Sequence, residues 1–329
     1  MSRIVSANDQ SIAEAAAILK AGGLVAIPTE TVYGLGANAL DGRAVARIFE
    51  AKGRPQFNPL IAHVANAAQA AEFVEMDERA LALADKFWPG PLTLVLPRKK
   101  NSGIADLACA GLPTMAIRVP AHKVALQLLK ICGFPVVAPS ANKSGSLSPT
   151  APMHVAESLG VAVDMILAAG ACKVGLESTV LDLSSGAPVI LRPGAVTAED
   201  IESVLGVGVG YDGAETSAPK APGMLLHHYK PGIPVRLGAI DLNPGEALLA
   251  FGSDKFMGIK GGGAARDLPE TMRRNLSEEG DLHQAAANLF SMLHDLDRKE
   301  HKGIAVMNIP ETGLGIAIND RLRRAASTL

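Results

Sequence analysis

Polar side chains follow a short apolar run near the N-terminus, in the stretch AIPTETVYGLG. Residues 24–27 are typical of a buried strand, and the hydroxyls of Thr29 and Thr31 and the carboxylate of Glu30 follow it directly. Open α/β sheets bind ligands beyond the ends of their strands, so this stretch is a candidate ligand site.

Four further groups of polar residues lie at the ends of predicted strands or helices. Together they offer arginines, a lysine and hydroxyls, which suit phosphates and a carboxylate held by an arginine fork. The groups are Lys52, Arg54 and Asn58 in AKGRPQFNPL; Thr114 and Arg118 around an apolar strand; Ser140, Asn142, Ser148 and Thr150 in and after PSANKSG; and Ser178 and Arg192 in GLESTV and ILRPG.

Each group also has an ordinary structural interpretation. Lys52 and Arg54 could interact with a helix C-terminus, and Ser140 could be a turn residue or a helix cap. His63, inside a strand, could be a satisfied core histidine. Five such groups within one domain favour a binding site over five separate structural roles.

Composition excludes several classes of protein. The chain has 329 residues, 31 basic and 33 acidic, and a net charge of −2, which argues against a large nonspecific grip on nucleic acid. Its three cysteines are far apart and odd in number, so we expect neither a disulfide framework nor a cysteine-rich metal site. There is no signal-like N-terminus and no apolar run near the ~18 residues of a spanning helix, which predicts a soluble cytoplasmic protein without a membrane partner.

Familiar catalytic motifs are missing. The sequence has no GxxxxGK[ST] phosphate loop, no HExxH and no nucleophile elbow. The glycines of 206–213 follow no predicted strand, so we interpret them as a loop, and 261–263 as a turn. No metal ligand set is predicted from the protein side chains.

The predicted elements give an α/β protein of two domains. Residues 1–200 alternate short strands and amphipathic helices, and several connections are too short for a crossover helix, which predicts a twisted mixed sheet. Residues 201–232 are rich in Gly, Pro, Ser and Ala and form a predicted linker. Residues 233–329 form a smaller predicted α/β domain.

The motif blocks resemble the YrdC-type threonylcarbamoyl-AMP synthase family. PTETVYGLG, KGRPxxNPL, SANxSGxxSPT, GLESTVLDL and ILRPG match in order across 9–198. HHYKPGIPV, NLSEEGDLHQAAANLF and GLGIAINDRLRRAA are similar to the longer, two-domain members. The resemblance implies a twisted sheet with a concave, positively charged face and a C-terminal domain that is Rossmann-like in outline.

The family joins L-threonine, bicarbonate and ATP into threonylcarbamoyl-AMP and releases pyrophosphate. A separate transferase complex then moves the threonylcarbamoyl group to the adenosine beside the anticodon of tRNA. The resemblance therefore implies an ATP-using nucleotidyltransferase with at most weak direct tRNA binding. It also implies Mg²⁺ bound mainly through ATP phosphates, with Glu30 and Glu177 as weaker candidates.

The resemblance also assigns roles to the polar groups. The implied threonine pocket contains Thr31, His63, Arg118, the Ala138 backbone and Ser178, with glycines that let backbone come close to ligand. The implied nucleotide site contains Lys52, Arg54, Asn58, Thr114, Ser140, Asn142, Ser148, Arg192 and Tyr229, of which Lys52 and Arg54 are the expected catalytic residues. The linker is implied to fold over the catalytic face as a lid that excludes water.

Two other functions remain open at this point. An RNA-binding protein is disfavoured by the net charge and by the lack of aromatic stacking motifs. A carbamoyl-adenylating enzyme of hydrogenase maturation shares the implied fold, but the accessory zinc-finger and acylphosphatase regions of that group are missing from this sequence.

Overall fold

The computed structural model describes residues 3–212, 229–254 and 257–327. Within these residues the chain forms two compact units. The first contains 3–144, 148–173 and 177–212, and the second contains 145–147, 174–176 and the described residues from 229 onward. The predicted lid residues 213–228 lie outside the described part, so the lid stays a prediction.

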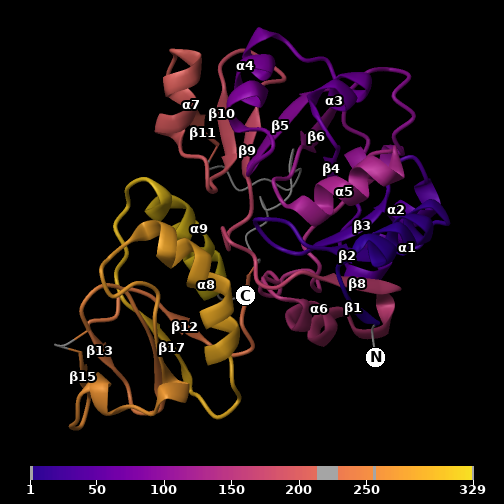
Figure 1. The fold of residues 1–329 in the computed structure, drawn as a ribbon. Coiled ribbons are helices and arrows are strands. Elements are labelled where there is room, and N and C mark those ends of the chain that lie inside the picture. The colour runs from indigo at the N-terminus through magenta and orange to yellow at the C-terminus, as the bar shows by residue number, and fades with distance from the viewer. Residues whose placement is uncertain (1–2, 213–228, 255–256, 328–329) are drawn as a thin grey trace. The chain divides into compact units, whose positions relative to one another are not determined.

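The first unit is built on one mixed sheet, as the short connections predict (Figure 1). Its described strands run in the order β1-β8-β2-β3-β7-β4-β6-β5-β9-β10-β11. Neighbours such as β4 and β6 are parallel, whereas β2 and β3 are antiparallel. The strands are β1 (Ile4–Ser6), β2 (Val25–Ile27), β3 (Gly34–Asn38), β4 (Ile61–His63), β5 (Leu92–Pro97), β6 (Thr114–Arg118), β7 (Val136–Val137), β8 (Met165–Ala168), β9 (Thr179–Asp182), β10 (Val189–Arg192) and β11 (Gly210–Tyr211).

The helices of this unit begin and end where local sequence signals favour it. Asp41, the predicted cap, accepts hydrogen bonds from the backbone N–H groups of Arg43 and Ala44, and Gly53 ends the same helix in a left-handed conformation. The helices are α1 (Asp9–Lys20), α2 (Gly42–Lys52), α3 (Ala67–Phe73), α4 (Glu78–Phe87), α5 (Lys123–Cys132), α6 (Pro152–Leu159) and α7 (Ala198–Leu205), with 3₁₀ turns η1 (Asp106–Cys109) and η2 (Gly160–Ala162).

Some predicted local structure was wrong or incomplete. The glycine-rich segment 206–213 is not only a loop, because β11 pairs in parallel with β10. Strand β3 was not predicted, because its sequence GLGAN carries little strand propensity. A Cβ on Gly34 would lie 3.0 Å from the Ala138 Cβ, and one on Gly36 would lie 3.1 Å from Val136. These glycines therefore allow close approach of the neighbouring strand, and the close approach of a ligand stays a prediction.

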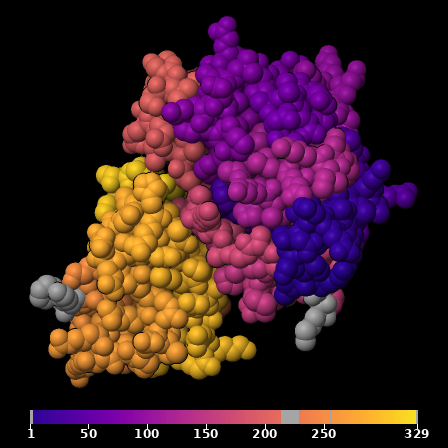
Figure 2. Space-filling model, viewed as in Figure 1, coloured from indigo at the N-terminus to yellow at the C-terminus, as the bar shows by residue number. Residues whose placement is uncertain are grey.

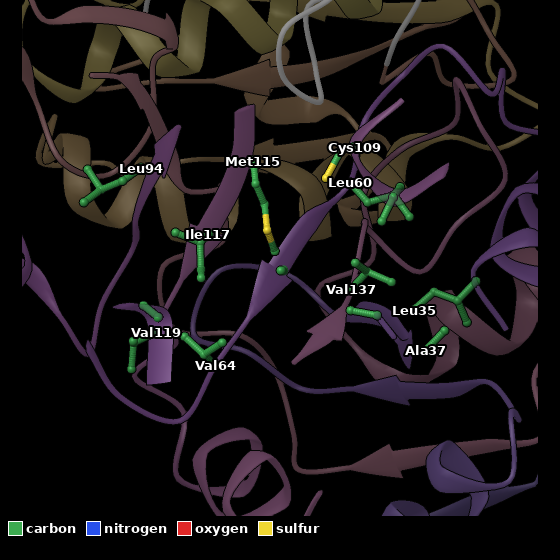
Figure 3. Packing of buried hydrophobic residues seen from close by; sticks show 14 of the residues in the cluster. Leu35, Ala37, Leu60, Val64, Leu94, Cys109, Met115, Ile117, Val119 and Val137 are labelled. Atoms are coloured by element: carbon green, nitrogen blue, oxygen red, sulfur yellow. The ribbon is translucent and has the colours of Figure 1, made fainter. Parts of the chain in front are cut away.

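The two faces of this sheet are covered differently. One face packs into a large apolar layer, in which Figure 3 shows Leu35 of β3, Leu94 of β5 and Ile117 of β6 among the buried side chains. On the other face α1 and α5, which contact each other, cover β8, β2 and β7. A small apolar cluster of strand residues lies on this second face, formed by Ile61, Val95, Ala116, Val180 and Leu191.

The second unit has a parallel sheet with the described order β12-β17-β14-β16, so the predicted Rossmann-like outline is confirmed. Its elements lie in the part of the chain that is coloured orange to yellow in Figure 2. They are β12 (Val235–Arg236), β14 (Glu246–Ala250), β16 (Arg273–Asn275), β17 (Gly303–Val306), α8 (Leu282–Leu296), α9 (Leu314–Ala326), the pair β13 (Asp241–Leu242) and β15 (Gly258–Ile259), and 3₁₀ turns η3 (Ala265–Asp267) and η4 (Glu270–Met272).

A search of the described residues for a helix with the length and apolarity to span a membrane finds none.

Cys109 and Cys172 are buried as free thiols, and burial raises the pKa of Cys172 to about 12.

Candidate functional site

Three polar residues of the first unit, His63, Thr93 and Arg118, share one face of its sheet. Side chains two residues apart on a strand point to the same face, so His63 follows Ile61, and Arg118 follows Ala116. Thr93 precedes Val95 on β5 in the same way. The small apolar cluster is therefore the floor on which His63, Thr93 and Arg118 lie, in the part of the face beyond the layer formed with α1 and α5.

Arg118 is the centre of the first group of site residues. Its side chain is 3% exposed, and its Nε donates to the Gly90 carbonyl at 3.0 Å. Its Nη1 donates to Thr31 Oγ1 at 3.0 Å, and its Nη2 donates to Glu30 Oε1 at 2.5 Å. A guanidinium has five N–H groups, so two of them remain for a ligand.

The loop after β2 holds Glu30 and Thr31 in place through Thr29. Thr29 Oγ1 accepts hydrogen bonds from the backbone N–H groups of Thr31 and Val32, both at 3.2 Å, and donates to the Val32 carbonyl at 2.6 Å. The Thr29 hydroxyl thus satisfies backbone groups that a neighbouring strand would otherwise satisfy, so the chain can turn here while it stays buried. The hydroxyls after the apolar run thus build a tight turn that directs Glu30 and Thr31 toward Arg118.

His63 is paired with Arg118 on the neighbouring parallel strands β4 and β6. Its side chain is buried, and its Nδ1 has no hydrogen-bond partner within the described residues. Burial, and secondarily the charge of Arg118, lower the pKa of His63 to about 3. The imidazole is therefore neutral at physiological pH and can position a ligand but is a poor general base.

Lys52 joins the end of α2 to the loop after β7. Its Nζ donates to the carbonyls of Ser140 at 2.6 Å and Asn142 at 2.5 Å, and reaches Asn142 Oδ1 at 3.4 Å. Burial, and secondarily the charge of Arg54, lower the pKa of Lys52 well below its usual value. The Lys52 amine is therefore buried and held by neutral oxygens. A polyanionic ligand beside it would stabilise its charged form.

Arg54 and Asn58 lie in the segment between α2 and β4. Arg54 Nε donates to the Asn58 carbonyl at 3.2 Å, and its Nη2 donates to the Pro59 carbonyl at 3.0 Å. The Asn58 side chain is 1% exposed, and both its amide nitrogen and its oxygen lack partners within the described residues. A buried amide without partners is costly for the fold, which makes the Asn58 side chain a candidate to bind a ligand.

Ser178, Thr93 and Arg192 form a further group. The Thr93 and Ser178 hydroxyls lie 2.7 Å apart, and Arg192 Nη2 donates to Ser178 Oγ at 3.1 Å and to its carbonyl at 2.9 Å. Ser148 donates a short hydrogen bond to Glu177, the carboxylate directly before Ser178. The Ser178 hydroxyl, directly before β9, and the Arg192 guanidinium, at the end of β10, thus lie together.

Two predicted residues are close to the site through the backbone. The Ala138 N–H donates to the Ile61 carbonyl at 3.0 Å, two residues before His63. Thr114 begins β6 on the face that carries Arg118. No described contact assigns Thr114 a ligand role, so that assignment stays a prediction.

Tyr229 belongs to the second unit. Its ring is buried, with its centroid 5.3 Å from that of Phe290, and the Arg321 guanidinium lies 5.4 Å from its centroid. The predicted contact between Tyr229 and the nucleotide stays a prediction.

Sequence reasoning missed Thr93 and underrated Glu30 as site residues. Thr93 is a hydroxyl within the apolar strand LTLVLP, and it falls on the same alternation as Val95. Because Thr93 and Val95 are two residues apart on the strand, their side chains share a face, and this spacing could have identified Thr93 once Val95 was known to line the site. Glu30 had been considered only as a weak Mg²⁺ ligand, although its partner Arg118 lies 88 residues away in sequence.

Unsatisfied buried side-chain atoms collect in this region. Within the described residues of the first unit they are Glu30 Oε2, both Asn58 amide atoms, His63 Nδ1 and Thr150 Oγ1. Native structures leave few such atoms without a partner, and those left commonly await a ligand. Apart from His63, which the sequence analysis considers separately, the residues concerned all fall in the polar groups that the sequence singles out.

Comparison with known proteins finds matches that cover both units of the chain. The family model Sua5_yciO_yrdC, described as "Telomere recombination", matches residues 17–194, and the model for the C-terminal domain of threonylcarbamoyl-AMP synthase matches 196–327. The threonylcarbamoyl-AMP synthase of Pyrococcus abyssi is 42% identical over 322 residues, covering 95% of this chain and 93% of that protein. The Bacillus subtilis enzyme of the same name is 40% identical, covering 98% and 94%.

A solved structure is also similar over nearly the whole chain. The crystal structure of P. abyssi Sua5 complexed with L-threonine has a TM-score of 0.87 and 38% identity, covering 99% of this chain and 97% of that one. Both domains are therefore matched in order, in sequence and in fold. The chain belongs to the Sua5/YrdC family of threonylcarbamoyl-AMP synthases, in its two-domain form.

Proposed function

We propose that this protein condenses L-threonine, bicarbonate or CO₂, and ATP into threonylcarbamoyl-AMP and pyrophosphate. The observation that carries the proposal is the buried Arg118, which keeps two N–H groups for a ligand beside the unsatisfied Glu30 and His63. A similar structure, that of P. abyssi Sua5, was solved with L-threonine.

The threonine subsite follows from the chemistry of these groups. The two N–H groups left on Arg118 fit a carboxylate in a bidentate geometry. The hydroxyls of Thr31 and Ser178, the neutral imidazole of His63 and the Ala138 backbone are suited to the polar atoms of a small hydroxylated amino acid. A site that hydrogen-bonds a substrate hydroxyl rejects analogues that lack it, which would favour threonine over valine.

The nucleotide subsite would use the remaining polar groups. Lys52 and Arg54 would neutralise phosphate oxygens, and the open amide of Asn58 would bind a polar atom of the nucleotide. We also assign Thr114, Ser140, Asn142, Ser148, Arg192 and Tyr229 to this subsite, on the resemblance of their motifs.

The chemistry requires positioning and charge stabilisation more than a strong nucleophile. The amine attacks CO₂ to form a carbamate, and a carbamate oxygen then attacks the α-phosphorus of ATP as pyrophosphate leaves. Lys52 and Arg54 would stabilise the charge that builds on the phosphates, which is commonly the largest part of such catalysis. The carbamate is labile, so making and trapping it in one site protects it from water.

Mg²⁺ would enter with ATP rather than through a cage of protein ligands. The described residues contain no group of three or more His, Cys, Asp or Glu side chains able to hold a metal. Mg²⁺ commonly keeps several waters and binds through substrate phosphates, which fits this donor set. Glu177 is the carboxylate that would contact its water shell, and the ion would neutralise phosphate charge there.

The product would pass to a transferase complex that modifies tRNA beside the anticodon, and we place this reaction in the cytoplasm. Direct tRNA binding would be weak at most, since the net charge is −2. An RNA-binding role without ATP turnover would show salt-dependent RNA affinity instead.

Product analysis tests the proposal. The protein is incubated with ATP, Mg²⁺, L-threonine and ¹³C-bicarbonate, and the adenylates are separated and weighed by mass spectrometry. We expect threonylcarbamoyl-AMP with one ¹³C, and none with valine. Formation of AMP or ADP without a labelled adenylate would contradict the proposal.

A further inference from the structure

Glu30 is a buried carboxylate that uses one oxygen and leaves the other open. The residue is 8% exposed, and its Oε1 accepts a hydrogen bond from Arg118 Nη2 at 2.5 Å. Its Oε2 is buried and has no partner within the described residues. The pair with Arg118 thus fixes the carboxylate in place and leaves one of its oxygens for a ligand.

The pair presents opposite charges side by side, which is the pattern of an amino-acid zwitterion. Arg118 keeps two N–H groups, since the other three donate to Gly90, Thr31 and Glu30. These N–H groups suit an α-carboxylate, and Glu30 Oε2 suits the α-ammonium group beside it. His63 is neutral and offers the ammonium no opposite charge.

We propose that Glu30 Oε2 binds the α-ammonium group of threonine and takes the proton that the amine must lose before it attacks CO₂. This inference rests on the proposed function, and it makes Glu30 a catalytic residue of that reaction. Lys52 is poorly placed for the same role, because its Nζ donates to the Ser140 and Asn142 carbonyls.

The step balances with bicarbonate as the carbon source. Bicarbonate gives CO₂ and hydroxide. One ammonium proton moves to Glu30 Oε2, the nitrogen lone pair forms the N–C bond, and a C–O π pair moves onto oxygen. The second excess N–H proton joins the hydroxide as water. The products are the carbamate, water and neutral Glu30, which returns its proton to solvent before the next turnover.

Several charged or titratable groups face Glu30 and bear on the pH dependence of the test. Arg118 of β6 is in direct contact with it. His122, the N-cap of α5, and Cys172 interact with its charge. Burial lowers the pKa of His122, and burial raises the pKa of Cys172 to about 12. Between pH 7 and 9 neither group changes charge, so a slope in that range reports on the amine and its acceptor.

The test measures threonine-dependent pyrophosphate release between pH 7 and 9. Glu30→Gln keeps an oxygen that can accept the hydrogen bond of Arg118, but it removes the carboxylate that would take the proton. We expect kcat/KM for threonine to fall about 100-fold at pH 7 and to rise about tenfold per pH unit, as solution deprotonates the amine instead. The matched control is Asp182→Asn, which also removes a buried carboxylate, one that accepts hydrogen bonds from Ser184, and should keep the wild-type slope.

The reverse adenylyl transfer supplies an independent readout. ATP formation from threonylcarbamoyl-AMP and pyrophosphate needs no amine deprotonation, so Glu30→Gln should retain it within about threefold. A pH profile parallel to the wild type, or equal losses in both directions, would overturn the inference.

Two further measurements keep the two proposals separate. If Glu30→Gln does not fold, Glu30→Asp should lower the forward rate at least tenfold more than the reverse rate, and equal losses would overturn the role of Glu30. Wild-type protein without threonine-dependent turnover would instead overturn the proposed function itself.

Discussion

Arg118 and His63 occupy paired positions on the parallel strands β6 and β4, so a permanent cation lies beside a buried imidazole. The consequence is a His63 pKa of about 3, caused by burial first and by Arg118 second. A histidine held neutral in the fold but free to ionise when unfolded couples stability to pH.

His63 should make the protein less stable as the pH falls below the unfolded pKa of about 6.5. Between pH 6.5 and 3 the unfolded chain binds up to one more proton at this position than the folded chain. The free energy of unfolding therefore decreases as the pH is lowered through this range. The expected contribution is about 2 kcal/mol lost at pH 5 relative to pH 8. Denaturant unfolding of wild type and His63→Gln at both pH values measures it. An equal pH dependence in the two proteins would contradict the assigned pKa.

Asn58 should matter for ATP and not for the fold. Its side-chain amide makes no hydrogen bond within the described residues, so Asn58→Ala removes none. We expect KM for ATP to rise about tenfold, with Tm lowered by no more than about 2 °C.

Asn66→Ala is the matched control for Asn58→Ala. Asn66 caps α3 by accepting a hydrogen bond from the Gln69 N–H at 2.9 Å. Its loss should cost about 1 kcal/mol of stability and leave KM for ATP unchanged. Equal effects of the two substitutions on Tm and KM would exclude a ligand role for Asn58.

Lys52 should be required as a compact cation. Lys52→Met removes the ammonium and leaves the carbonyls of Ser140 and Asn142 without its hydrogen bonds. We expect kcat/KM for ATP to fall at least about 100-fold, and Lys52→Arg to restore little, because the planar fork does not fit this buried space. Steady-state kinetics with ATP varied checks this, and full rescue by arginine would disprove the requirement.

Thr93 should act on threonine through Ser178. Thr93→Val removes the hydroxyl that lies 2.7 Å from Ser178 Oγ, so Ser178 loses one of the contacts that orient it. KM for threonine should rise about fivefold while KM for ATP stays unchanged. The effect should be absent in a Ser178→Ala background, because the two residues act through one hydrogen bond.

Thr179 provides the control for Thr93. It lies opposite Leu92 on β9, and its hydroxyl donates to the Val196 carbonyl at 2.6 Å and accepts from its N–H at 3.0 Å. Thr179→Val should lower Tm and leave KM for threonine unchanged. A rise in KM with Thr179→Val equal to that with Thr93→Val would show that general destabilisation explains both.

Candidate site residues could be chosen from the sequence, but the contacts between them could not. Lys52, Arg118 and Ser178 could be chosen from their positions at the ends of apolar strands and of a helix, because those positions are set by local patterns. The pair of Glu30 with Arg118 could not, because it depends on how distant strands are ordered in the sheet. Strand β3 was missed because its glycines are required by close approach of β7, which is a tertiary constraint.

Pyrophosphate release from ATP, with and without L-threonine and bicarbonate, tests the central claim most directly. The claim predicts release only when both are present, with Arg118→Ala lowering it by raising KM for threonine. Release that is indifferent to threonine would mean that the fold is kept with another substrate, and the roles proposed for Thr31, His63, Arg118 and Ser178 would be contradicted.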